Sequence, residues 1–228
     1  MWRQSVRAEA SVGTGGCAAS VLLDMRKFYE AFRLRLLRDR AAGCAFDAVV
    51  TKVCCNVYAG PRMVRFGSLC HSSGFAFCGL PAGCIFSDVW VRVYCLRAFD
   101  SFVASHPQVD PDFYVDDLTV GTCGTSKASV AQIVGRAAHD LHQSIVRDLE
   151  SDVAVEKAAI VASSPDLAVD VSVVMGQRWH FACRVDATLN LGVDFLPGAA
   201  RVRHGGRRRR AGVQPLRPDL QLWRHPGV

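Results

Sequence analysis

The chain has 228 residues and a formal net charge of +6. Half of its residues are hydrophobic, which is enough to bury a substantial core and excludes a chain that is disordered throughout. It contains no apolar run near the roughly 18 residues that a membrane-spanning helix needs, and its first residues lack the apolar middle of a signal peptide. We therefore expect an intracellular protein, nuclear or cytoplasmic, with no membrane partner.

The elements predicted in the first half of the chain begin with a buried strand at 20–25, SVLLDM. An amphipathic helix is expected at 27–43, because apolar residues recur at helical spacing as far as Gly43. Residues 46–60 are predicted to be helical or mixed, and residues 61–69 alternate like an edge strand with a turn. The segment 79–84, GLPAGC, is a predicted loop.

The second half alternates long helices with short strands. The expected elements are a helix at 85–106, two strands within 112–123, a helix at 127–152, and strands at 154–163 and 188–198. This order predicts an α+β fold in which helices pack on one face of a mostly antiparallel sheet.

The positive charge is concentrated in the C-terminal tail. Residues 199–228 hold eight of the 27 basic residues and one of the 21 acidic residues, which leaves 19 basic and 20 acidic residues before them. The tail is rich in Gly, Pro and Arg, so it is predicted to be disordered. Its run of Arg207, Arg208, Arg209 and Arg210 fits a phosphate-binding or nuclear-address segment, and fits a solvated charge run about as well.

Two adjacent acids, Asp116 and Asp117, interrupt a segment that otherwise favours strands, and a hairpin turn is the simplest explanation. A further acid, Asp24, ends the first predicted strand. If that strand pairs beside the hairpin, three carboxylates converge, which is unfavourable unless a cation neutralises them. Two Mg²⁺ ions, or Mn²⁺ in their place, suit such oxygen ligands and promote nucleotidyl transfer.

These acids lie within five motifs that resemble, in order, the palm domain of reverse transcriptases, especially those of non-LTR retroelements and group II introns. VLLDMRKFYEAF resembles the first catalytic motif, GLPAGCIFS resembles GxPQGxxxS, and FYVDDL resembles the aromatic-x-Asp-Asp hairpin. VEKAAIVAS and NLGVDF resemble the lysine and Leu-Gly elements that follow. The resemblance covers residues 18–196 and implies a polymerase palm-like antiparallel sheet.

The resemblance implies catalytic roles for the matched residues. Asp24 and Asp116 would bind both Mg²⁺ ions, Asp117 would support them electrostatically, and the backbone carbonyl of Met25 would complete one coordination shell. Lys157 would stabilise or protonate the leaving pyrophosphate, with a surface lysine as the alternative.

Nucleotide and template binding would involve a second set of matched residues, namely Tyr29, Gly79, Pro81, Gly83 and Tyr114. The Tyr29 ring would exclude a 2′-hydroxyl and so favour deoxynucleotides, unless it is simply a core aromatic. Gly79 and Gly83 would let the backbone approach template and nucleotide closely, since neither has a Cβ.

The sequence departs from the family at two places. Ala82 stands where the family usually has Gln, and only 23 residues precede Asp24, so we expect the fingers region to be largely missing. The expected organisation is a disordered segment at 1–17, a reverse transcriptase-like palm domain at 18–198 and the basic tail at 199–228.

The predicted function is that of an RNA-directed DNA polymerase palm, which extends a DNA primer on an RNA template with deoxynucleoside triphosphates. The alternative is a catalytically inactive palm remnant that binds RNA or another partner through its Arg-rich tail. A third reading is an unrelated α+β domain with a simple Asp-Asp turn, which a structure that holds Asp24 far from Asp116 would establish. The sequence gives no indication of the oligomeric state.

Ten cysteines occur without the CxxC spacing of a zinc site. Most have apolar neighbours, so they are predicted to be buried free thiols with no disulfide-linked partner.

Overall fold

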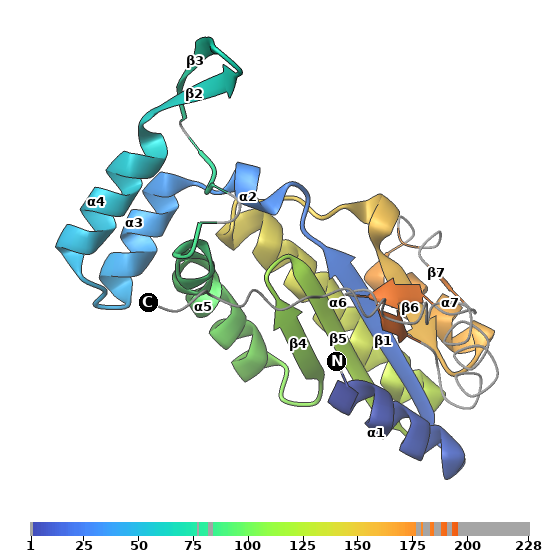
Figure 1. Cartoon of the computed structure of the whole chain (residues 1–228). Coiled ribbons are helices and arrows are strands. Elements are labelled where there is room, and N and C mark those ends of the chain that lie inside the picture. The colour runs from blue at the N-terminus through green and yellow to red at the C-terminus, as the bar shows by residue number, and fades with distance from the viewer. Residues whose placement is uncertain are drawn as a thin grey trace, which may run out of the picture.

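A five-stranded sheet with the strand order β4-β5-β1-β6-β7 forms the centre of the fold (Figure 1). The computed structural model of the chain describes residues 2–76, 78–81, 84–176, 179, 183–184, 188–190 and 193–195. The strands of the sheet are β1 (Cys17–Asp24), β4 (Asp110–Tyr114), β5 (Asp117–Gly124), β6 (Ala159–Ala162) and β7 (Cys183–Arg184). All neighbours pair antiparallel except β6 and β7, which are parallel, so the predicted α+β class with a mostly antiparallel sheet is confirmed.

Strand β1 is buried on both of its faces, which explains its almost continuous apolar sequence CAASVLLD. Its odd-numbered residues, among them Val21 and Leu23, join the main hydrophobic core. On the other face Leu22 packs with Ala159 and Val161 of β6 in a separate cluster. A central strand buried in this way loses the alternation that marks a half-exposed strand.

Three helices bury their apolar residues in the same core as the odd-numbered residues of β1. They are α5 (Ser87–Ser105), α6 (Lys127–Asp148) and α7 (Pro165–Met175). The predicted helices at 85–106 and 127–152 and their placement on one face are therefore confirmed. Helix α7 was not predicted, although Ser164 caps it by accepting a hydrogen bond from the Leu167 N–H and Pro165 stands in its first turn.

The N-terminal segment, predicted to be disordered, instead contains helix α1 (Trp2–Gly13). Long-range hydrogen bonds hold this helix in place, because the Gln4 amide donates to the Asp110 carbonyl and the Arg7 guanidinium pairs with the Asp110 carboxylate. The described side chains of α1 are absent from the main hydrophobic core, and the segment holds few large apolar residues, although those it has recur at helical spacing.

The helix predicted at 27–43 is two helices, α2 (Phe28–Ala31) and α3 (Leu34–Gly43). Between them the backbone is extended at Arg33, and the Phe32 ring is buried against Tyr94 with 3.9 Å between ring centroids. Burial of this ring directs the chain away from a continuous helix, a tertiary preference that overrides local propensity.

Helix α4 (Ala48–Ala59) runs beside α3 and leads into a hairpin of β2 (Pro61–Phe66) and β3 (Leu69–Phe75), which projects from one end of the molecule (Figure 1). The edge strand and turn predicted at 61–69 correspond to this hairpin. The hairpin leaves Phe66 83% exposed and Phe75 68% exposed, because no layer of the described structure covers it.

The strand predicted at 154–163 begins with a 3-10 turn, η1 (Val155–Lys157), before β6. The final predicted strand, 188–198, falls on the short pair β8 (Thr188–Asn190) and β9 (Val193–Phe195). The predicted tail at 199–228 lies outside the described residues. No helix in the described part of the chain is long and apolar enough to cross a membrane.

The cysteines are less buried than predicted. Cys17, Cys55 and Cys95 are buried free thiols, but Cys44 and Cys70 are exposed free thiols. Cys44 follows the end of α3 and Cys70 lies on the projecting hairpin, where apolar sequence neighbours do not imply burial.

A candidate active site at one end of the sheet

Two of the predicted acids face each other across adjacent strands. Asp24 is the last residue of β1 and Asp117 is the first residue of β5, and the two are direct Cα partners in the antiparallel register. Direct cross-strand partners project to the same face of a sheet, with Cβ atoms about 5 Å apart. The pairing predicted between the first strand and the Asp-Asp hairpin is therefore confirmed.

Asp116 lies next to this pair, in the turn between β4 and β5. The Met25 N–H donates a hydrogen bond of 3.0 Å to the Asp116 carbonyl, which extends the contact between the two chain segments by one residue. Asp24 and Asp116 thus lie in adjacent chain segments and do not show the wide separation that would establish an unrelated domain with a simple turn.

The turn itself has a strained backbone. Val115, which precedes Asp116, has φ of 57°, in the left-handed region that β-branched residues rarely adopt. Such strain persists only where surrounding structure fixes the backbone, and it is frequent at functional sites. The preceding Tyr114 pairs with Asp117 and leaves its side chain 61% exposed at the rim of the site.

Lys157 supplies a positive charge to this end of the sheet. Its Nζ donates to both carboxylate oxygens of Asp24, at 3.1 and 3.0 Å. The segment before Lys157 is held in place because the Ala154 N–H donates to the Asp24 carbonyl at 2.7 Å. The hydrogen bond and charge of Asp24 raise the pKa of Lys157, with smaller contributions from Asp116 and Asp117.

The carboxylates repel one another. Burial raises the pKa of Asp117, the negative charges of Asp116 and Asp24 raise it further, and Lys157 opposes the effect. Three acids and one lysine leave a net negative site, so a cation that enters it is favoured electrostatically.

A second group of predicted residues lies beside Asp116. The Gly79 N–H donates to the Phe32 carbonyl and the Leu80 N–H donates to the Tyr29 carbonyl, both at 2.7 Å, so the loop docks on α2. Burial raises the pKa of Tyr29, followed by the charges of Asp88 and Asp116, while a hydrogen bond with Ser87 lowers it.

Gly79 is required by its contact with α2. Its φ is +93°, and a Cβ built there would lie 3.1 Å from the Tyr29 carbonyl oxygen. The close approach at Gly79 is thus a contact between the loop and α2 of the same chain. Pro81 is exposed beyond the docked loop, whereas Gly83 and Ala82 lie outside the described residues, as do Arg207, Arg208, Arg209 and Arg210.

The donor chemistry of the site suits a hard divalent cation, because Asp24, Asp116 and Asp117 offer carboxylate oxygens with a net negative charge. Within the described residues, however, no group of three His, Cys, Asp or Glu side chains is gathered closely enough to hold a metal ion. Lys157 supplies the neutralising charge at Asp24 instead. The chemistry of these residues fits a cation, and the strand register places their backbones together.

One residue of this site, Asp88, was not singled out from the sequence. It lies in the first turn of α5, and its charge is the second largest influence on the pKa of Tyr29. In the sequence, its position could have indicated it. Asp88 directly follows the GLPAGCIFS motif and lies at a helix N-terminus, where an acid is stabilised.

No protein-family model matches the chain, and no curated protein matches it. Among solved structures, apo telomerase from Candida tropicalis, truncated from its C-terminal domain, matches with a TM-score of 0.53 and 12% identity. The match covers 86% of this chain and 38% of that chain. Telomerase from the same species in complex with a TWJ fragment of telomeric RNA matches with a TM-score of 0.44 and 13% identity, over 71% of this chain and 28% of that chain.

The first of these matches shows that the chain shares a fold with part of that telomerase. The chain spans less than two fifths of the telomerase chain that it matches.

Proposed function

We propose that the chain is the palm domain of an RNA-directed DNA polymerase, which adds deoxynucleotides to a DNA primer paired with an RNA template. The observation that carries this proposal is the register of Asp24 opposite Asp117, with Asp116 in the adjoining turn and Lys157 on Asp24. The shared fold with telomerase supports the same class of reaction. The extent proposed for the palm is residues 18–198.

In this proposal Asp24, Asp116 and Asp117 hold two Mg²⁺ ions, with the Met25 carbonyl as a further ligand. Mg²⁺ would activate the primer hydroxyl and neutralise charge on the leaving pyrophosphate. The hydrogen bond and charge of Asp24 raise the pKa of Lys157, so without a bound metal ion the lysine is positively charged beside Asp24 at neutral pH.

The residues around Tyr29 would position the nucleotide. The docked loop fixes Gly79 and Leu80 against α2, the helix that holds Tyr29. Tyr29 would lie beneath the sugar, and the exposed ring of Tyr114 would border the primer end. A site fixed by backbone hydrogen bonds orients reactants without reorganisation.

Primer extension on an RNA template with MgCl₂ tests the proposal. We compare wild type with Asp116→Asn, which keeps the shape of the side chain, and with Asp170→Asn, a matched loss of charge at an exposed position of α7. Asp116→Asn should lower the extension rate by at least about a hundredfold, while Asp170→Asn should leave it unchanged.

Equal extension by wild type and Asp116→Asn would exclude the assigned chemistry. A wild-type chain that binds RNA through Arg207, Arg208, Arg209 and Arg210 but extends no primer would support the alternative, a catalytically inactive palm remnant.

A further inference from the structure

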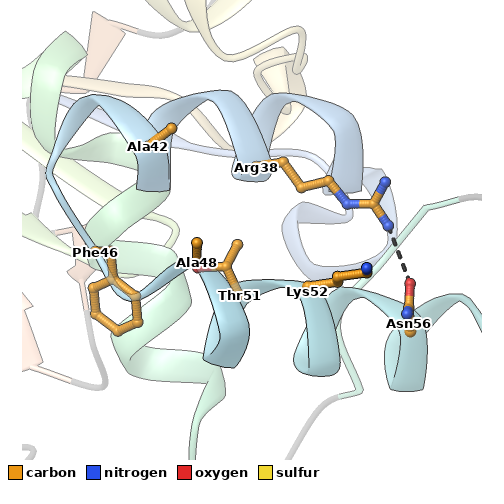
Figure 2. A pocket seen from close by; sticks show the side chains of 7 residues that line it. All are labelled: Arg38, Ala42, Phe46, Ala48, Thr51, Lys52 and Asn56. Atoms are coloured by element: carbon orange, nitrogen blue, oxygen red, sulfur yellow. Dashed lines mark hydrogen bonds between the residues drawn. The ribbon is translucent and has the colours of Figure 1, made fainter.

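Helices α3 and α4 enclose an open groove of about 380 Å³ on the part of the molecule that carries the β2–β3 hairpin (Figure 2). The two helices face each other along their lengths, and side chains from both point into the space between them. The groove is separate from the carboxylates of the candidate active site, none of which lines it.

One end of the groove is cationic. Arg38 of α3 and Lys52 of α4 approach it from opposite sides, and the Arg38 Nη2 donates to the Asn56 Oδ1 at 3.3 Å. Neither cation forms an ion pair with a carboxylate in the described part of the chain. Arg33 and Arg35, which belong to the same stretch of chain, both contact Glu150.

The opposite end of the groove is apolar. The half-buried Phe46 ring packs on the buried Trp90, with 5.0 Å between ring centroids, so its position is fixed. Ala42 and Ala48 line the space beside it, and their small side chains leave it open. The neighbouring Asp47 carboxylate accepts a hydrogen bond from the Val50 N–H at 2.8 Å and does not line the groove.

The groove therefore offers an aromatic surface at one end and two uncompensated cations at the other. Ala48 and Lys52 are four residues apart on α4, which corresponds to about 6 Å along the helix axis. An unpaired nucleotide has the matching arrangement, a flat base joined through its sugar to a phosphate. A duplex does not match, since its bases are stacked and paired.

We propose that this groove binds one nucleotide of single-stranded RNA, with the base beside Phe46 and the phosphate between Arg38 and Lys52. The choice of RNA over an acidic peptide rests on the proposed polymerase function. The β2–β3 hairpin, which follows α4, would contact an RNA strand that continues past the groove. It carries exposed Arg62 and the largely exposed rings of Phe66 and Phe75.

The phosphate end is tested by fluorescence anisotropy with labelled single-stranded RNA, without Mg²⁺ or nucleotides. The full-length chain carries Gln at Arg207, Arg208, Arg209 and Arg210, so that the tail does not mask the groove. In this background Lys52→Glu should weaken binding about tenfold and lower the slope of log K against log salt by about one. The matched control Lys127→Glu, at the start of α6, should change neither quantity comparably. Equal losses in the two variants would overturn the proposal.

The base end is tested by filling the groove. Ala42→Trp should weaken binding about tenfold while leaving the salt slope unchanged, and the control Ala128→Trp, exposed on α6, should bind like the parent. Circular dichroism and thermal denaturation check that each variant folds. If polyglutamate displaces the RNA as effectively as unlabelled RNA does, the groove recognises charge alone and the proposal fails.

The two proposals fail separately. If Lys52→Glu weakens RNA binding but the wild-type chain extends no primer, the polymerase function is overturned and the proposal for the groove stands. A chain that extends primers but binds RNA equally well with Lys52→Glu overturns the groove alone.

Discussion

Lys157 and Asp24 form a two-pronged ion pair across 133 positions of sequence, with the lysine Nζ 3.0 and 3.1 Å from the two carboxylate oxygens. The pair lies where β1 ends, beside Asp117 of β5 and the turn that holds Asp116. Lys157 therefore neutralises the carboxylate of Asp24, as a cation bound to Asp24 would.

Replacing Lys157 with Met should increase the stabilisation that MgCl₂ gives to the fold. Without the lysine the three carboxylates repel one another more strongly, so the variant should melt below wild type in the absence of Mg²⁺. Free Mg²⁺ at ten times its dissociation constant stabilises a folded chain by roughly 1.4 kcal/mol, and the variant should reach this at a lower Mg²⁺ concentration. Thermal denaturation across a MgCl₂ titration measures the effect. Lys127→Met is the control, and identical Mg²⁺ responses in wild type and Lys157→Met would contradict the prediction.

Replacing Asp117 with Asn should stabilise the fold at neutral pH when no divalent cation is present. Because the pKa of Asp117 is raised, the native state binds its proton more tightly than the unfolded state does. Its contribution is thus most favourable below the ordinary Asp pKa and is lost as the pH rises through the native pKa. We expect a gain in the free energy of unfolding at pH 7 that shrinks towards zero near pH 3.

Urea denaturation at several pH values measures this difference. Asp170→Asn, which removes a charge from an exposed position on α7, should show no such pH-dependent gain. A variant Asp117→Asn that is less stable than wild type at pH 7 would show that the carboxylate is held by favourable contacts instead.

Replacing Gly79 with Ala should destabilise the fold by about 1–2 kcal/mol, since Gly79 has positive φ and its Cβ would press on the Tyr29 carbonyl. Gly43→Ala is a matched control, because nothing lies within 4 Å of a Cβ there, and it should gain a few tenths to about 1 kcal/mol. The urea midpoint of each variant provides the measurement. If Gly79→Ala were as stable as wild type, the loop could not be docked on α2 as described.

Local sequence patterns were enough to predict the elements that carry the candidate site. The apolar run before Asp24 predicted a buried strand, and the acids between two strand-forming runs predicted a hairpin, because both depend on neighbours only a few residues away. The helices after the GLPAGC loop and after the hairpin were predicted for the same reason. The split between α2 and α3 was missed, because it depends on Phe32 packing against Tyr94 of a distant helix.

How these elements meet depends on contacts between distant parts of the chain. The register that places Asp24 opposite Asp117 follows from which strand faces are buried, and a slip of one residue would turn Asp24 to the other face. The contact of Lys157 with Asp24, the docking of Gly79 on α2 and the groove between Arg38 and Lys52 all join residues from separate elements. Local propensity cannot specify such contacts, since they arise from burial and hydrogen bonding between segments that are far apart along the chain.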